Sequence, residues 1–271
     1  MLSLKENTTD YFIDMNAYEI NKISCFSKFA LPLGLLIWVI LAGCAEERFV
    51  CNQSPCNSEV EIPTLNTSEL IQFETPPAIA PTDFGLCGNG GPLFDNRFSP
   101  YKGGTQSVDL VVEHYSALHC PHCAHFATYV DELLESRPEI DARVRFYFHH
   151  YPFNDYWHYH MAAFAISQQS MEKFWQFHDI LYRYTGVYFD YLALRDLAMY
   201  QLDVDMTAYD AATTTASSDA NAPGNRAQAF LEWEKSNARA HCVTCTPAVY
   251  LCGQLVDDWQ DLENRILKYL R

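Results

Sequence analysis

The sequence is poor in positive charge. Its 18 Lys and Arg residues are outnumbered by 34 Asp and Glu residues, which gives a formal net charge of −16 at pH 7. Proteins bind nucleic acid and anionic membrane surfaces through clustered cations, so we expect neither as a partner. The sequence also lacks an internal repeat. Its apolar and aromatic content is ample for one packed domain of ordinary size.

An apolar run long enough for a confident membrane span is also missing. Residues 29–43 form an apolar stretch of signal-peptide length, which follows Lys22 and Lys28 and ends before Cys44. The letters LAGC at its end resemble the lipobox of bacterial lipoproteins, in which the cysteine is lipidated and becomes the mature N-terminus. We therefore expect residues 1–43 to be a signal peptide and Cys44 to carry the lipid.

The leader has two further interpretations. Four acidic residues precede Lys22, which is unusual for the basic start of a signal, and a true start at Met15 would remove three of them. A single transmembrane anchor that begins near Phe29 is the alternative to lipidation. The lipid anchor and the transmembrane anchor both place the folded part outside the cytoplasm, on a bacterial membrane and facing the periplasm or the cell surface.

Cysteine is abundant, and ten cysteines fit an oxidising compartment better than a reducing one. Eight remain when Cys25 in the leader and Cys44 are set aside. Cys51 and Cys56 are suited to a local bridge. The sequence does not fix the pairing of Cys87, Cys242, Cys245 and Cys252, and the alternative is that these four are free thiols. The eight are Cys51, Cys56, Cys87, Cys120, Cys123, Cys242, Cys245 and Cys252.

Residues 44–99 are polar, acidic and rich in Pro, Asn and Gly, without sustained periodicity. This composition predicts a flexible tether. The string CGNGGP at 87–92 is typical of turns. The alternative is a small lobe that disulfides at Cys51, Cys56 and Cys87 hold together.

The tetrapeptide Cys120-Pro121-His122-Cys123 lies between a strand-like run, Val108–Tyr115, and a helical pattern. A cysteine at a helix N-terminus is near unpaired N–H groups and the positive end of the helix dipole, which favour a thiolate. We expect Cys120 to be unusually acidic and reactive, and Cys123 to be the less exposed resolving thiol. A protonated His122 would add to the stabilisation of the thiolate.

Pairs of the form Cys-x-x-Cys have other uses. A structural disulfide is one, and half of a zinc site with Cys242-x-x-Cys245 as its second half is another. Covalent haem attachment requires a histidine after the second cysteine, but Ala124 follows here. A copper or zinc binding protein that uses Cys120 and Cys123 is the rival function. Several histidines lie near the motif or the second strand: His119, His125, His149, His150, His158 and His160.

From about residue 100 onward, the patterns predict an α/β fold, a thioredoxin-like sheet with an inserted helical subdomain over about 154–240. Strand patterns before and after the first helix give a βαβ unit, and two short strands and an amphipathic helix end the chain. The strand patterns are Val108–Tyr115, Val144–His149, Ala248–Cys252 and Gln254–Val256. The later helical patterns cover 159–184, 190–202, 206–215, 225–240 and 258–270.

Four segments resemble the DsbA-like thiol-disulfide oxidoreductases. The resemblance covers about 100–271 and implies that Thr246–Pro247 is a cis peptide bond facing the redox cysteines; an ordinary trans turn is the alternative. It also implies a quinone-linked oxidase in the membrane as redox partner, and no organic cofactor or metal. The segments are VDLVVEHYSALHCPHC at 108–123, VRFYFHHYPF at 144–153, EKFWQFHDILY at 172–182 and VTCTPAVYLCGQLV at 243–256.

The sequence departs from the family in two ways. Family members commonly have a buried acid, a proton carrier, six residues before the first cysteine, whereas this sequence has His114 there and Glu113 one residue earlier. A bulge that turns Glu113 inward, or a proton relay through His114, would supply the missing function. A core histidine and a surface glutamate are the alternative. The cysteines at 242 and 245, where relatives usually have glycine, and at 252, where asparagine is common, would allow an extra disulfide beside the active-site loop.

Together these features predict an extracytoplasmic enzyme that introduces disulfides into exported, cysteine-containing proteins. A substrate thiolate would attack Cys120 of an oxidised Cys120–Cys123 pair. Thr246 and Pro247 would present backbone groups to the extended substrate strand. A reductase or isomerase on the same fold is the alternative, because threonine also precedes the cis-proline in such relatives.

Overall fold

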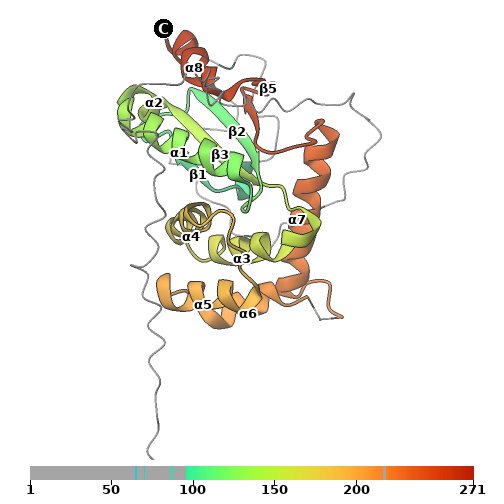
Figure 1. The fold of residues 1–271 in the computed structure, drawn as a ribbon. Coiled ribbons are helices and arrows are strands. Elements are labelled where there is room, and N and C mark those ends of the chain that lie inside the picture. Colours follow the sequence, from blue (N-terminus) through green and yellow to red (C-terminus); the bar gives the residue numbers. More distant parts are fainter. Residues whose placement is uncertain (1–64, 66–69, 71–86, 88–95, 216–217) are drawn as a thin grey trace, which may run out of the picture. The chain divides into compact units, whose positions relative to one another are not determined.

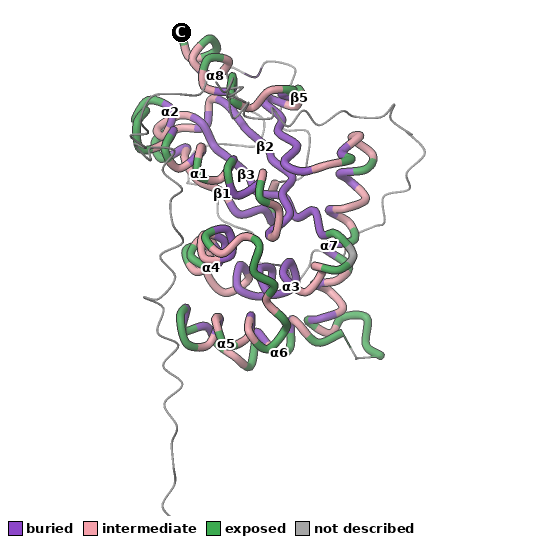
Figure 2. The backbone as a smooth tube through the Cα atoms, in the orientation of Figure 1, coloured by how far each residue is buried: buried purple, intermediate pink, exposed green. Residues whose placement is uncertain are grey.

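A five-stranded sheet forms the centre of the fold (Figure 1). The computed structural model describes residues 65, 70, 87, 96–215 and 218–271. The strand order is β1-β3-β2-β4-β5, with β2 and β3 parallel and the other neighbours antiparallel. Every residue of β2 and β3 is buried, as Figure 2 shows, because both faces of this pair are covered. The strands are β1 (Tyr101–Gly103), β2 (Leu110–Ser116), β3 (Val144–His150), β4 (Ala248–Leu251) and β5 (Gln254–Leu255).

Helices α1 (Pro121–Ser136) and α2 (Pro138–Arg143) connect β2 to β3 and complete the predicted βαβ unit. Phe126 and Val130 of α1 pack on Val112 of β2 and Ile266 of the last helix, α8 (Leu262–Leu270). The prediction began the first strand at Val108, but the strand begins at Leu110. The last helix was predicted from 258; a 3-10 turn, Trp259–Asp261, precedes α8 there.

Five helices form the predicted insertion, and four of them pack around the fifth, α3 (Figure 1). Helix α3 contacts each of the other four, and for this reason its residues from Tyr159 to Ser167 are all buried. The single helix predicted over 159–184 is wrong. The chain turns after α3, and the Ser170 side chain accepts a hydrogen bond from the Lys173 N–H to start a new helix. The helices are α3 (Trp157–Ser167), α4 (Met171–Arg183), α5 (Tyr191–Gln201), α6 (Met206–Thr213) and α7 (Pro223–Ala240).

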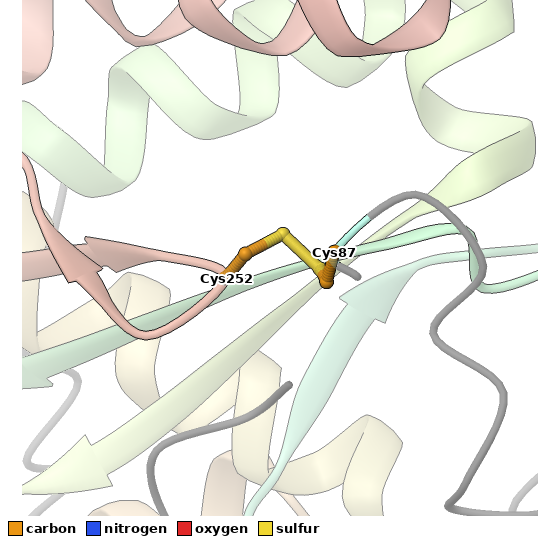
Figure 3. Close-up of a disulfide and its surroundings, with 2 residues drawn as sticks. All are labelled: Cys87 and Cys252. Carbon is orange, nitrogen blue, oxygen red and sulfur yellow. A yellow bond between two sulfur atoms is a disulfide. The ribbon is translucent and has the colours of Figure 1, made fainter. Parts of the chain in front are cut away.

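Described residues from the region predicted to be a tether, 44–99, lie against the domain. Leu70 is buried with Phe98, and Leu65 packs on the same cluster. Cys87 forms a disulfide with Cys252, at the turn between β4 and β5 (Figure 3). The segment is therefore attached to the domain at these points. The proposed Cys51–Cys56 bridge, the signal peptide and Cys44 lie outside the described residues.

No helix within the described ranges is long and apolar enough to cross a membrane. The apolar stretch at 29–43 is not part of those ranges.

Two tyrosines of one buried cluster differ in what their hydroxyls contact. The Tyr159 hydroxyl accepts a hydrogen bond of 2.6 Å from the Phe189 N–H and donates one of 3.4 Å to the Val187 carbonyl. The buried Tyr209 hydroxyl has no hydrogen-bond partner among the described residues. Burying an unpaired hydroxyl is unfavourable, whereas losing a paired one costs about 0.5–1.5 kcal/mol.

We expect Tyr209→Phe to leave the free energy of unfolding unchanged or to raise it, and Tyr159→Phe to lower it by about 1 kcal/mol. Urea denaturation of both variants, followed by circular dichroism, measures the difference. Equal losses in the two variants would contradict the assignment of their hydroxyl contacts.

Candidate active site

The two motif cysteines lie at the start of α1, where β2 ends. Cys120 is the residue before the helix, and Pro121 occupies its first turn. Proline suits this position, because its fixed φ matches the helix and its missing N–H has no helical partner there. Both cysteines are free thiols; Cys120 is partly exposed, while Cys123, one turn on, is fully buried. The exposed thiol is thus open to a substrate and the second is not.

The loop before β4 faces Cys120. Strands β2 and β4 pair antiparallel with Tyr115 opposite Ala248, so the residues just before β4 meet the residues just after β2. The Thr246–Pro247 bond in this loop is cis. The Cys120 thiol donates a hydrogen bond of 3.5 Å to the Thr246 carbonyl. The sheet therefore brings together two segments that are 126 residues apart.

The environment of Cys120 favours its thiolate. Hydrogen bonds lower the pKa of the Cys120 thiol to about 6, and the largest contribution is from the Cys123 side chain. The backbone N–H groups of Cys123 and His122 and the side chain of Thr246 add to this effect, and partial burial opposes it. The exposed helix N–H groups thus act as the sequence predicts. The contribution of His122 to this lowering is made by its backbone N–H. The role predicted for its imidazole stays a proposal.

Cys123 is shifted in the opposite direction. Burial raises the pKa of the Cys123 thiol well above 9, and its hydrogen bond and proximity to Cys120 raise it further. The Thr246 side chain and the backbone of Ala117 offset part of this increase. At neutral pH the pair therefore consists of one thiolate and one thiol, which is the distribution that thiol–disulfide exchange requires.

The residues proposed to replace the family's acid lie on opposite faces of β2. The strand pairs without interruption on both sides, so it has no bulge that would turn Glu113 toward α1. Glu113 is fully buried and accepts a hydrogen bond of 3.0 Å from the Asn96 side chain, so the alternative of a surface glutamate is wrong. His114 is on the α1 face, where its ring packs against Phe126 and Phe148. Burial keeps the pKa of His114 well below 6.5, so this ring is neutral.

One residue near Cys123 escaped the sequence analysis. Tyr182, at the end of α4, is buried in the same cluster as Cys123, and its hydroxyl donates a hydrogen bond of 3.4 Å to the Ala117 carbonyl. Burial, and then the proximity of Cys123, raise the pKa of Tyr182 well above 10. The residue ends the segment EKFWQFHDILY, which carried the resemblance but gave no sign of this contact.

The other histidines are used mainly in packing and hydrogen bonding. The His149 ring is paired with Glu234 at 2.9 Å and both are buried, while the His150 and His160 rings share a hydrogen bond of 2.9 Å. His119 stacks on Tyr156 with ring centroids 3.5 Å apart. Within the described part of the chain, no group of three or more His, Cys, Asp or Glu residues is arranged to hold a metal ion.

The additional cysteines are oxidised. Cys242 and Cys245, just before the Thr246 loop, are both disulfide-bonded, and Cys252 is bonded to Cys87. Free thiols at these positions, and a zinc site completed by Cys242 and Cys245, are therefore wrong as alternatives. The pairing of Cys87 with Cys252 links positions 165 residues apart, which no local spacing rule predicts.

The pKa values make a direct prediction for the reduced protein. Alkylation of Cys120 requires the thiolate, so its rate should be half-maximal near pH 6 and fall as the pH decreases through that value. Cys123→Ala removes the largest cause of the low pKa and should raise the midpoint, whereas Cys123→Ser keeps a hydrogen-bond donor and should raise it less. Ultraviolet absorbance of the thiolate against pH measures all three. An unchanged midpoint in Cys123→Ala would show that the cause is misassigned.

Comparison with known proteins agrees with this geometry. No curated protein matches the sequence. Among solved structures, oxidised BdbD from Bacillus subtilis is 16% identical, with a TM-score of 0.52 over 64% of this chain and 92% of that protein. The thiol-disulfide exchange protein alpha-DsbA2 from Wolbachia pipientis is 17% identical, with a TM-score of 0.50 over 63% and 85% of the two chains. These likenesses support the fold.

The sequence itself matches a family model described as thioredoxin over residues 100–267, which is more than half of the chain. That range contains the two free thiols and the cis-proline loop that faces them. The chain thus belongs to the thioredoxin family, as a dithiol-disulfide oxidoreductase.

Proposed function

We propose that this protein is an extracytoplasmic oxidase that transfers the Cys120–Cys123 disulfide to exported proteins. The observation that carries the proposal is the opposite shift of the two thiol pKa values, with Cys120 at about 6 and Cys123 well above 9. A stable thiolate at Cys120 favours the reduced form of the pair. A pair whose reduced form is stabilised is a strong oxidant of other dithiols.

The transfer would begin with a substrate thiolate that attacks the Cys120 sulfur of the oxidised pair. The Cys120–Cys123 bond breaks, Cys123 leaves as a thiolate and takes up a proton, and a mixed disulfide joins Cys120 to the substrate. A second substrate thiolate then attacks the substrate sulfur and releases Cys120 as a thiolate. The substrate gains a disulfide, and the pair gains two electrons that a membrane redox partner would remove.

The surroundings of Cys120 suit an extended substrate. The Thr246 carbonyl lies 3.5 Å from the Cys120 sulfur, and a strand bound beside the loop would use such backbone groups. Pro247 has no backbone N–H. Of these two residues, Thr246 is therefore the one that has both a backbone donor and a backbone acceptor. We assign to Thr246 and Pro247 the positioning of the substrate chain next to Cys120.

An oxidising location is supported by the disulfides of the domain. Cys87, Cys252, Cys242 and Cys245 are all bonded, and disulfides of this kind persist outside the cytoplasm. We place the protein on the outer side of a bacterial membrane, held by lipid on Cys44, with cysteine-containing exported proteins as substrates.

The reduction potential decides between the oxidase and the reductase or isomerase. Equilibration with glutathione or dithiothreitol buffers should give a potential closer to about −120 mV than to the −270 mV typical of thioredoxin. Oxidised protein should also speed disulfide formation in a reduced, unfolded test protein, and Cys120→Ser should abolish this activity. The double variant Cys87→Ala/Cys252→Ala, which lacks the disulfide of Figure 3, should keep it. A potential near −270 mV would assign the pair to reduction.

The anchor has its own test. Growth of bacteria expressing the full chain with labelled palmitate should label the wild type and not Cys44→Ser, which should also leave the membrane fraction. Cys25→Ser, which alters the cysteine within the predicted leader, is the matched control and should be labelled normally. Equal labelling of Cys44→Ser would end the lipoprotein proposal and leave the oxidase proposal intact.

A further inference from the structure

The exchange step creates a proton problem at Cys123. When a substrate attacks Cys120, the Cys123 sulfur leaves as a thiolate in a fully buried position, where burial opposes charge. A proton must therefore reach Cys123 from solvent. His114 and Glu113, the residues first considered for this role, have other contacts: the His114 ring lies against Phe126 and Phe148, and Glu113 is on the opposite face of β2.

The backbone of Ala117 hydrogen-bonds both Cys123 and a tyrosine. The backbone of Ala117 hydrogen-bonds the Cys123 sulfur, and its carbonyl accepts a hydrogen bond of 3.4 Å from the Tyr182 hydroxyl. Both side chains belong to one buried cluster. The Ser116 side chain also hydrogen-bonds Tyr182. The Tyr182 hydroxyl thus lies at the same turn of the backbone as the buried sulfur, and it can both give and accept a proton.

Tyr182 is 8% exposed, and its exposed part lines an open cleft between α1 and α4. The cleft has a volume of about 630 Å³ and is also lined by Pro121 and Ala124, beside the redox cysteines. Asp179 and Arg183 make the wall of this cleft polar on the α4 side. Water in the cleft can therefore contact a residue whose other side faces the Cys123 cluster.

Charged and titratable groups lie near the tyrosine on its own helix and at the start of α1. On its own helix, the His178 ring is 4.4 Å from the Tyr182 ring, and His178 Nδ1 is 2.7 Å from Asp179. On α1 it faces Cys120 and Cys123. Burial and these thiols keep the pKa of Tyr182 well above 10, so Tyr182 does not hold a negative charge and can pass a proton only while it receives another.

We infer that the Tyr182 hydroxyl relays a proton between water in the cleft and Cys123 during disulfide exchange, a role that rests on the proposed function. As the Cys120–Cys123 bond breaks, the Tyr182 O–H bond breaks and an S–H bond forms at Cys123. In the same step a proton from water in the cleft replaces the one that the hydroxyl gives up. In the reverse, reductive direction the Cys123 thiol returns its proton by the same route before it attacks Cys120. No oxidant beyond the disulfide itself is needed.

The test is single-turnover transfer from the oxidised full-length protein to a reduced cysteine peptide, followed by tryptophan fluorescence in H₂O and D₂O. Tyr182→Phe keeps the ring and removes the hydroxyl. We expect it to react at least about 10-fold more slowly than the wild type, since proton transfer by a positioned group typically contributes 10²–10⁴-fold and water in the cleft would replace part of it. We also expect the solvent isotope effect on the transfer rate to differ between Tyr182→Phe and the wild type.

Tyr209→Phe is the matched control, because Tyr209 is a buried tyrosine of the same cluster whose hydroxyl contacts no partner among the described residues. It should react at the wild-type rate. The relay is overturned if Tyr182→Phe reacts at the rate of Tyr209→Phe, or if it is slower with an unchanged isotope effect. The pKa of Cys120 and the reduction potential should stay at wild-type values in Tyr182→Phe, which separates proton relay from a general disturbance of the site.

Two further outcomes are decisive. If Tyr182→Phe does not fold, the wild type alone tests the relay, because transfer without any solvent isotope effect would overturn it. If the wild-type protein transfers no disulfide to the peptide, the proposed function itself fails. Normal transfer by both wild type and Tyr182→Phe would remove only the relay.

Discussion

The pairing of β2 with β4 is the constraint on which the active site depends. Strand β2 ends at Ser116 and leads into the motif, and β4 begins at Ala248, directly after the cis-proline loop. Their antiparallel register sets Tyr115 opposite Ala248 and so fixes the distance between Cys120 and Thr246. The parallel partner β3 buries the other edge of β2. A shift of this register by one residue would turn His114 away from α1 and separate the two loops.

The site obtains two different thiols from one short helical turn. Cys120 lies before the helix, where N–H groups without helical partners point at its sulfur, and Cys123 lies inside the packed cluster. The same hydrogen bond between them lowers one pKa and raises the other. Reactivity at Cys120 therefore depends on a neighbour that is kept protonated by burial, so packing around Cys123 is part of the chemistry of Cys120.

Local features of the sequence allowed much of this to be predicted. The alternation around the motif indicated the βαβ unit, and the position of Cys120 before a helix indicated its low pKa. The cis bond at Pro247 followed from the family resemblance, because no local pattern encodes it. Contacts between segments distant in the sequence were not predictable. The packing of α4 brings Tyr182 to Ala117, and Cys87 is bonded to Cys252, which is 165 residues away in the sequence. The break between α3 and α4 was missed because helical patterns on both sides were joined across the short polar stretch SQQS at 167–170, in which Ser170 caps the start of α4.

The disulfide between Cys87 and Cys252 raises a question of selectivity within a single molecule. An enzyme that exchanges disulfides carries another disulfide that the same thiolates are able to attack. Cys252 is 2% exposed and Cys87 9%, whereas Cys120 is open to solvent. An attacking thiolate must reach a sulfur along the line of the S–S bond, and the burial of Cys87 and Cys252 restricts that access. Access therefore distinguishes the Cys87–Cys252 bond from the Cys120–Cys123 pair, so that this bond stays oxidised while the pair exchanges disulfides.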